Sequence, residues 1–258
     1  MKSFQGYVLD LDGVLYKGSR PIPGARQLLK ALRKKHAEIC FLSNASFHSR
    51  KAIARKLASL GMPCKPSEVI NSGYAAAQYI LKTYGKCKVF ILGEGDLAKE
   101  VRGAGLEVGK QNARVVLVGL DRHINYRKLT HALYLLRSGA VFLACNADAT
   151  YPSEKGIMPG AGAMIGAVQN SSGKKPKIIG KPSSFMMKLC LKLMGLRAQQ
   201  VAVIGDRLDT DILMANKAGA YSILVLTGVT SSKIAGQAKG ASKPDLVVRD
   251  LVRLRKLL

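Results

Sequence analysis

Short apolar runs alternate with longer segments of helical period along almost the whole chain. An apolar run bounded by turn residues is typical of a buried strand, and apolar residues at every third or fourth position are typical of a helix. The predicted strands are 6–10, 38–42, 88–92, 114–120, 140–145, 177–179, 201–205, 222–226 and 245–248. The predicted helices include 24–35, 48–60, 73–83, 126–137, 160–170, 183–194, 209–218 and 250–257. This alternation predicts an α/β fold with a doubly wound parallel sheet, whose ligand sites lie beyond the carboxyl ends of the strands.

The predicted elements divide better into two domains than into one sheet of nine strands. Every polar cluster of catalytic type lies before about residue 70 or after about residue 178, and the middle has strands and helices of its own. The second crossing between the parts is polar and turn-rich, as a linker is. We therefore predict a core domain of residues 1–70 and 178–258 and an inserted, smaller α/β domain of residues 71–177.

Composition limits the class of protein. Of the 258 residues, 48% are hydrophobic, so a large core is available. The longest apolar runs are far shorter than the roughly 18 residues of a membrane span, and no secretory signal is visible. The five cysteines form no C-x-x-C pair and the four histidines show no ligand spacing, which argues against a zinc site. We expect a cytoplasmic protein with reduced cysteines.

Forty-one Lys and Arg residues stand against sixteen Asp and Glu, a formal net charge of +25. Such a charge attracts anionic substrates, and it is also typical of proteins that bind nucleic acid or an anionic surface. The basic residues are spread along the polar sides of predicted helices, and no aromatic-rich stretch or binding motif accompanies them. Surface solvation is the preferred interpretation, and nucleic-acid binding stays open.

The scarce acidic residues gather at the ends of two predicted strands. Asp10 and Asp12 end the first strand, and Asp206, Asp209 and Asp211 follow the strand 201–205. Crowded carboxylates repel one another, and a cation relieves that repulsion. Because oxygen ligands suit a divalent ion, the pattern indicates a metal site with carboxylate left over for chemistry.

Neutral and positive groups follow two further strands. Ser43 and Asn44 end the second strand and offer a hydroxyl and an amide to a phosphoryl oxygen, or else a cap for the next helix. Lys181 follows the strand 177–179 within Gly180-Lys181-Pro182 and places a cation at the same edge of the sheet. No Walker phosphate-binding loop is present in the sequence.

The order Asp-x-Asp, Ser, Lys, Asp-x-x-x-x-Asp, each after a strand, resembles the haloacid dehalogenase (HAD) superfamily. Residues 7–16, 180–182 and 205–212, with Asn146-Ala147-Asp148 and residues 156–162, resemble the NagD-like and p-nitrophenyl phosphatases. That resemblance implies a HAD core with an inserted type-two cap. One departure is Ala45, because the subfamily usually carries two consecutive asparagines after the Ser or Thr; the departure bears on substrate choice.

The resemblance implies a phosphatase. Asp10 would be the nucleophile that forms an aspartyl-phosphate, and Asp12 the general acid and then the general base. Mg²⁺ would be held by the Asp10 carboxylate, the Asp12 backbone carbonyl and the Asp206 carboxylate. An acid at position 12 favours phosphate-ester chemistry over dehalogenation, and the position of the insert favours hydrolysis over mutase chemistry.

Further roles follow from the same resemblance. Ser43, the amide groups near Asn44 and Lys181 would stabilise charge on the phosphoryl oxygens. Asp211 would orient Lys181 or a metal-bound water, and Asp148 would contact the substrate from the cap. Asp209 is expected only to cap a helix.

The implied substrate is a small phosphate monoester: a sugar phosphate, phosphoglycolate, glycerol phosphate or nucleotide, with p-nitrophenyl phosphate as an artificial substrate. The resemblance also implies a homodimer through the cap. Two alternatives stay open at this point, a nucleic-acid or anionic-surface binding protein on a HAD scaffold and a phosphotransferase to an acceptor other than water.

Overall fold

The computed structural model describes residues 3–153 and 156–258. The predicted domain ranges also include residues 1, 2, 154 and 155, which lie outside the described residues. The chain folds into two compact units. The first unit comprises Met1–Ser43, Ile53–Ile70 and Lys181–Leu258, and the second comprises Asn44–Ala52 and Asn71–Gly180.

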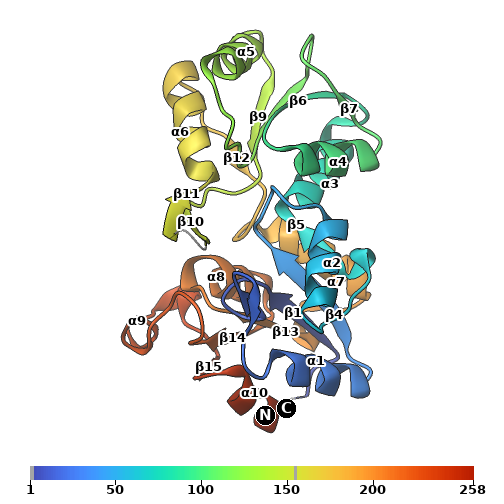
Figure 1. Ribbon diagram of the computed structural model, residues 1–258, viewed down its shortest axis with the longest axis vertical. Helices are drawn as coiled ribbons and strands as arrows, with labels where there is room; N and C mark the ends of the chain where they lie inside the picture. Colours follow the sequence, from blue (N-terminus) through green and yellow to red (C-terminus); the bar gives the residue numbers. More distant parts are fainter. Residues whose placement is uncertain (1–2, 154–155) are drawn as a thin grey trace. The chain divides into compact units, whose positions relative to one another are not determined.

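The first unit is built on a six-stranded sheet, whose strands are labelled in Figure 1. Its strands, in spatial order, are β15 (Leu246–Val248), β14 (Tyr221–Val225), β13 (Val201–Gly205), β1 (Gly6–Asp10), β4 (Glu38–Ser43) and β5 (Val69–Asn71). The chain proceeds outward from β1 through β4 to β5, and outward on the other side from β13 through β14 to β15. The switch point of this doubly wound sheet therefore lies between β1 and β13, where a ligand site is expected.

Helices bury both faces of that sheet. They are α1 (Ala25–Lys34), α2 (Arg50–Ser59), α7 (Ser184–Met194), α8 (Leu213–Ala218), α9 (Ser232–Gly236) and α10 (Leu251–Leu257). The apolar sides of α1, α2 and α10 pack with alternate residues of the strands, such as Leu9 and Phe41, in one core cluster. Because both faces are covered, the central strands read as continuous apolar runs rather than alternating ones. A short hairpin, β2 (Tyr16–Lys17) and β3 (Arg20–Pro21), follows β1.

The second unit has a five-stranded parallel sheet of its own. Its spatial order is β12 (Lys177–Ile178), β9 (Val141–Ala144), β8 (Val115–Val118), β6 (Lys88–Leu92) and β7 (Glu107–Val108). Figure 1 shows α5 (Tyr126–Arg137) and α6 (Ala161–Ser172) along one side, and α3 (Ser72–Tyr84) with α4 (Gly95–Gly103) along the other. An antiparallel hairpin, β10 (Thr150–Ser153) and β11 (Gly156–Pro159), precedes α6.

The predicted α/β fold class with parallel sheets is confirmed, and several elements have the predicted bounds, among them β1, β6, β13 and α5. The sequence pattern did not predict α4 or the β10–β11 hairpin. The predicted core domain also included residues 44–52 and 178–180, whereas in the structure they group with the second unit. Among the described residues, no helix is long and apolar enough to cross a membrane.

Candidate active site

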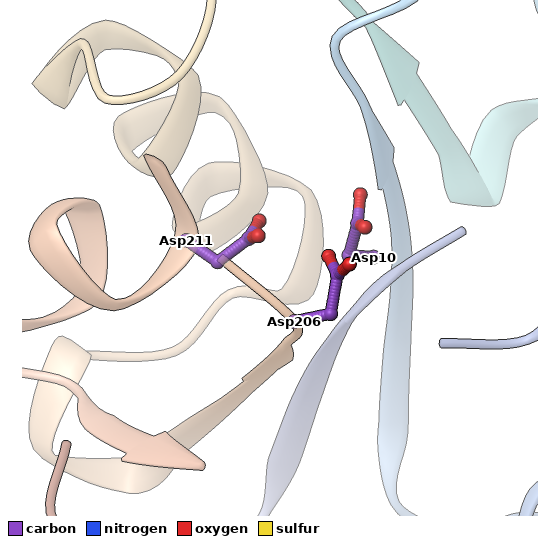
Figure 2. A group of neighbouring side chains, drawn as sticks. All are labelled: Asp10, Asp206 and Asp211. Carbon is purple, nitrogen blue, oxygen red and sulfur yellow. The ribbon is translucent and has the colours of Figure 1, made fainter. Parts of the chain in front are cut away.

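Three carboxylates meet at the switch point of the first unit's sheet. Asp10 is the last residue of β1, Asp206 directly follows β13, and Asp211 lies in the next turn. One carboxylate oxygen of each residue lies within 4.8 Å of the corresponding oxygens of the other two. Figure 2 shows the three side chains. Residues Leu208–Ile212 form one turn of π-helix, a local widening that is frequent at functional sites. Asp211 lies within this turn and is fully buried.

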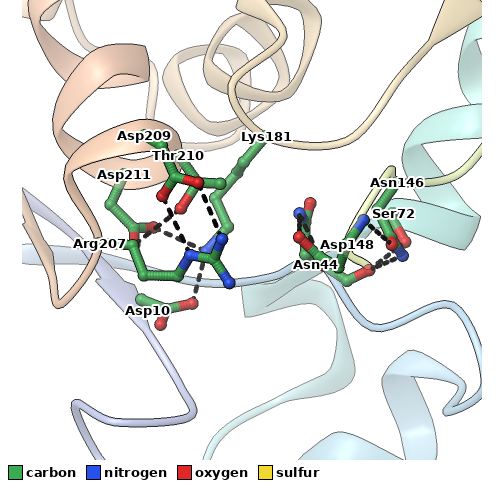
Figure 3. Close-up of polar contacts among 10 residues, drawn as sticks. All are labelled: Asp10, Asn44, Ser72, Asn146, Asp148, Lys181, Arg207, Asp209, Thr210 and Asp211. Carbon is green, nitrogen blue, oxygen red and sulfur yellow. Dashed lines mark hydrogen bonds and ion pairs between the residues drawn. The ribbon is translucent and has the colours of Figure 1, made fainter. Parts of the chain in front are cut away.

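Lys181 joins two of these carboxylates. Its Nζ donates to Asp10 Oδ1 at 2.5 Å and to Asp211 Oδ1 at 2.7 Å (Figure 3). The Lys181 side chain is only 4% exposed. Burial by itself lowers the pKa of this ammonium, but the charges of Asp10 and Asp211 outweigh burial and raise the pKa above its usual value. The two carboxylates therefore favour the charged form of Lys181.

One ammonium does not balance three carboxylates. Burial raises the pKa of Asp10 well above its usual value, and the charges of Asp211 and Asp206 add to this against the opposing charge of Lys181. Burial, together with Asp211, also raises the pKa of Asp206, to about 6. A divalent cation would relieve this repulsion, and carboxylate oxygens are the hard donors that Mg²⁺ and Ca²⁺ prefer.

Backbone groups surround the Asp206 carboxylate closely. Its Oδ2 accepts a hydrogen bond from the Val229 amide at 2.8 Å, and its backbone carbonyl accepts one from Thr230 Oγ1 at 2.6 Å. A Cβ on Gly228 would lie 1.9 Å from Asp206 Oδ2, and one on Gly13 would lie 2.4 Å from it. These residues hold the carboxylate in one place. The sequence does not predict the roles of Gly228, Val229 and Thr230, because no motif marks their loop.

Asp12 is not one of the three clustered carboxylates. It follows β1 by two residues, forms an isolated bridge with Tyr16, and its side chain reaches solvent. The protein around it still removes enough water to raise its pKa, against the opposing charges of Lys56 and Lys181. An acid that is exposed and has a raised pKa is suited to proton transfer.

Ser43 is the buried last residue of β4, beside the end of β1, since Leu42 pairs with Asp10. The first unit therefore brings Ser43 to the same sheet edge as Asp10, Lys181, Asp206 and Asp211.

Asn44, the next residue, groups with the second unit, where it meets Asp148. Asn44 Nδ2 donates to Asp148 Oδ2 at 3.2 Å, and the Asn44 carbonyl accepts hydrogen bonds from Ser72 Oγ and Asn146 Nδ2, both at 2.7 Å (Figure 3). The structure therefore brings Asn44 and Asp148 together as a bonded pair.

The expectation that Asp209 caps a helix was wrong. Asp209 is exposed and accepts two hydrogen bonds from Arg207, at 3.1 and 2.8 Å, and no side chain caps either the π-helical turn or α8. The Arg207 bonds lower the pKa of Asp209. An ion pair at the surface contributes little to stability.

Ligand sites of doubly wound sheets lie at the switch point, and here that point holds three carboxylates and a buried lysine. Carboxylates can bind a cation and a lysine can bind an anion, so the fold and the site are those of an α/β enzyme that binds both. Residues 7–107 match the family described as "Haloacid dehalogenase-like hydrolase", and residues 178–254 match the one described as "HAD-hyrolase-like". The acid sugar phosphatase of Staphylococcus epidermidis is 36% identical over 232 residues, which are 90% of this chain and 90% of the relative.

Solved structures agree. The p-nitrophenyl phosphatase from Archaeoglobus fulgidus superimposes with a TM-score of 0.93 at 36% identity, covering 100% of both chains. The glycerol phosphate phosphatase from Mycobacterium tuberculosis, in complex with magnesium, gives a TM-score of 0.93 at 34% identity, covering 100% of this chain and 80% of that one. The chain belongs to the haloacid dehalogenase-like hydrolases, and it is a phosphoric monoester hydrolase of the NagD-like, p-nitrophenyl phosphatase type.

Proposed function

We propose that the enzyme is a Mg²⁺-dependent phosphatase of a small phosphate monoester and that it works through an aspartyl-phosphate on Asp10. The observation that carries this proposal is the contact of Lys181 with both Asp10 and Asp211 beside Asp206. In the same proposal the first unit is the catalytic core and the second unit is the cap.

Mg²⁺ fits this centre because its donors are carboxylate oxygens, and because Gly13 and Gly228 let the backbone approach Asp206 closely and fix its carboxylate. Asp10, Asp206 and the backbone carbonyl of Asp12 would hold the ion. When bound, it would supply positive charge that neutralises the carboxylates and the developing charge of the phosphoryl group.

Asp10 begins the reaction. One of its oxygens forms a bond to phosphorus while the bond from phosphorus to the leaving oxygen breaks, and Asp12 gives its proton to that oxygen. Asp12, now a carboxylate, takes a proton from water as the water attacks phosphorus. The bond between phosphorus and Asp10 breaks, so inorganic phosphate leaves and Asp10 is restored.

Three groups would stabilise the transferred phosphoryl group. Lys181 offers positive charge to its oxygens. The Ser43 hydroxyl and the backbone amide groups near Asn44 offer hydrogen-bond donors. Asp211 keeps the Lys181 ammonium in place through the 2.7 Å bond. Asp148, which accepts a hydrogen bond from Asn44, would contact the leaving group.

The substrate class is a small phosphorylated metabolite: a sugar phosphate, glycerol phosphate, phosphoglycolate or nucleotide. The test is the release of inorganic phosphate from these compounds and from p-nitrophenyl phosphate, with Mg²⁺ and with EDTA. We expect turnover that needs Mg²⁺. Equal turnover in EDTA would refute the role of the metal, and transfer of phosphate to added glycerol in place of water would identify a phosphotransferase.

A further inference from the structure

The segment Asn44–Ala52 directly follows the proposed phosphate-binding residue Ser43, yet it groups with the second unit. It leads from the end of β4 into the first turn of α2. A connection between consecutive elements of one sheet usually packs against that sheet. Here side chains of the second unit bind the segment at both of its ends.

The first anchor lies at residues 44–46. The Asn44 carbonyl accepts from Ser72 and Asn146, as described above. Ser46 Oγ accepts from the Leu120 amide at 3.0 Å and is buried. A Cβ on Gly119 would lie 2.8 Å from Ser46 Oγ, so the glycine permits this close approach.

The second anchor consists of two acids on α4. Asp96 Oδ2 accepts from the Ser49 amide at 2.8 Å. Glu100 Oε1 accepts from the Arg50 amide at 2.6 Å, and its Oε2 from Arg50 Nε at 3.2 Å. Asp96 and Glu100 are four residues apart, on one face of α4.

Both acids cap the start of another helix. The first amide groups of α2 have no partner within the helix, and the helix dipole makes this end positive, so a carboxylate stabilises it. Glu100 is only 8% exposed, and a buried carboxylate is costly unless it is bonded. Its bonds to Arg50 are therefore strong constraints on where α2 begins.

We propose that Asp96 and Glu100 are positioning residues for the reaction: by fixing residues 44–50 they hold Ser43 and the amide groups of Asn44 and Ala45 where the phosphoryl group binds. This inference rests on the proposed function. Only six residues separate Ser43 from Arg50, and both ends of that stretch are held. A shift at the helix start therefore passes directly into the phosphate-binding residues. Neither acid is expected to touch the substrate.

The test compares Glu100→Gln, Glu100→Ala and Asp96→Asn with the wild type. The measured quantities are kcat, KM and the inhibition constant of inorganic phosphate, using p-nitrophenyl phosphate and glycerol phosphate. The segment would act on the transferred phosphoryl group, which all substrates share. We therefore expect kcat/KM to fall by the same factor for both substrates and the inhibition constant to rise about tenfold in Glu100→Ala. Glu100→Gln, which keeps an acceptor, should show a smaller effect.

Two controls separate positioning from a loss of stability. Glu107→Gln removes a 67% exposed carboxylate from the same unit, where it pairs with Lys88, and should change nothing. Leu136→Ala opens a cavity in the core of that unit, so it should lower the thermal midpoint yet leave the inhibition constant unchanged. Far-UV circular dichroism gives the midpoint, since the chain has no Trp.

The inference is overturned if the Asp96 and Glu100 variants bind phosphate and turn over as the wild type does, while Ser43→Ala raises the inhibition constant; the proposed function then stands. If Ser43→Ala leaves phosphate binding unchanged, the phosphate site itself has been misassigned. Should Glu100→Ala fail to fold, the near-isosteric Glu100→Gln and Asp96→Asn provide the same comparison.

Discussion

Removing the buried ammonium at position 181 should destabilise the first unit as well as abolish turnover. In Lys181→Met, Asp10 and Asp211 lose the cation that both now contact, at 2.5 and 2.7 Å. The side chains of Lys181, Asp10 and Asp211 are 4%, 11% and 1% exposed, so solvent screens their charges little. A hydrogen bond to a charged group contributes about 1.5–3 kcal/mol. Breaking a buried ion pair costs about 3–5 kcal/mol, and we expect a loss of that size.

The assay is urea unfolding followed by far-UV circular dichroism, alongside the rate of phosphate release. The double variant Lys181→Met/Asp211→Asn removes one of the stranded charges, so it should recover at least half of the lost stability and none of the activity. Lys128→Met is a matched control, because Lys128 pairs with the buried Asp121 at 2.7 Å in the second unit. It should lower stability and leave the catalytic constants unchanged. A single Lys181→Met variant as stable as the wild type, or a double variant no better than the single, would refute the reasoning.

Three further outcomes are expected. Gly228→Ala places a Cβ against Asp206 and should weaken Mg²⁺ binding by about 10- to 100-fold, measured by titration of activity; Gly236→Ala, whose Cβ meets nothing within 4 Å, should have no effect. Mg²⁺ at about 100 times its dissociation constant should raise the unfolding free energy by about 2.7 kcal/mol in the wild type, and Asp206→Asn should lose most of this gain. Asp12→Asn should give a burst of p-nitrophenol followed by slow turnover, because p-nitrophenol leaves with little help from an acid whereas the attacking water still needs a base. A steady rate with no burst would argue against Asp12 as the general acid and base.

The main features of the first unit could be predicted from the sequence for a simple physical reason. Strands buried on both faces read as continuous apolar runs, so β1 and β13 were found with their bounds. Parallel strands end at one edge of a sheet, so polar residues after each strand had to gather there. Asp10, Ser43 and Asp206 follow this rule.

The rest depends on backbone geometry that has no period and no motif. The π-helical turn 208–212 reads as an ordinary helix start, which is why Asp209 was expected to cap it. The loop with Gly228 and Val229 contacts Asp206 through a backbone N–H, and every residue type except Pro offers such a donor. Helix α4 begins at Gly95, and its two acids act on a distant segment that only the folded chain brings near.

The central claim is that Asp10 carries the phosphoryl group during turnover. Acid quenching of the enzyme during turnover of p-nitrophenyl phosphate with Mg²⁺, followed by proteolysis and mass spectrometry, measures this directly. We predict one phosphoryl group on the peptide that contains Asp10, and neither the adduct nor turnover in Asp10→Asn. Turnover by Asp10→Asn at the wild-type rate, or a phosphoryl group found on another residue, would contradict the proposed mechanism.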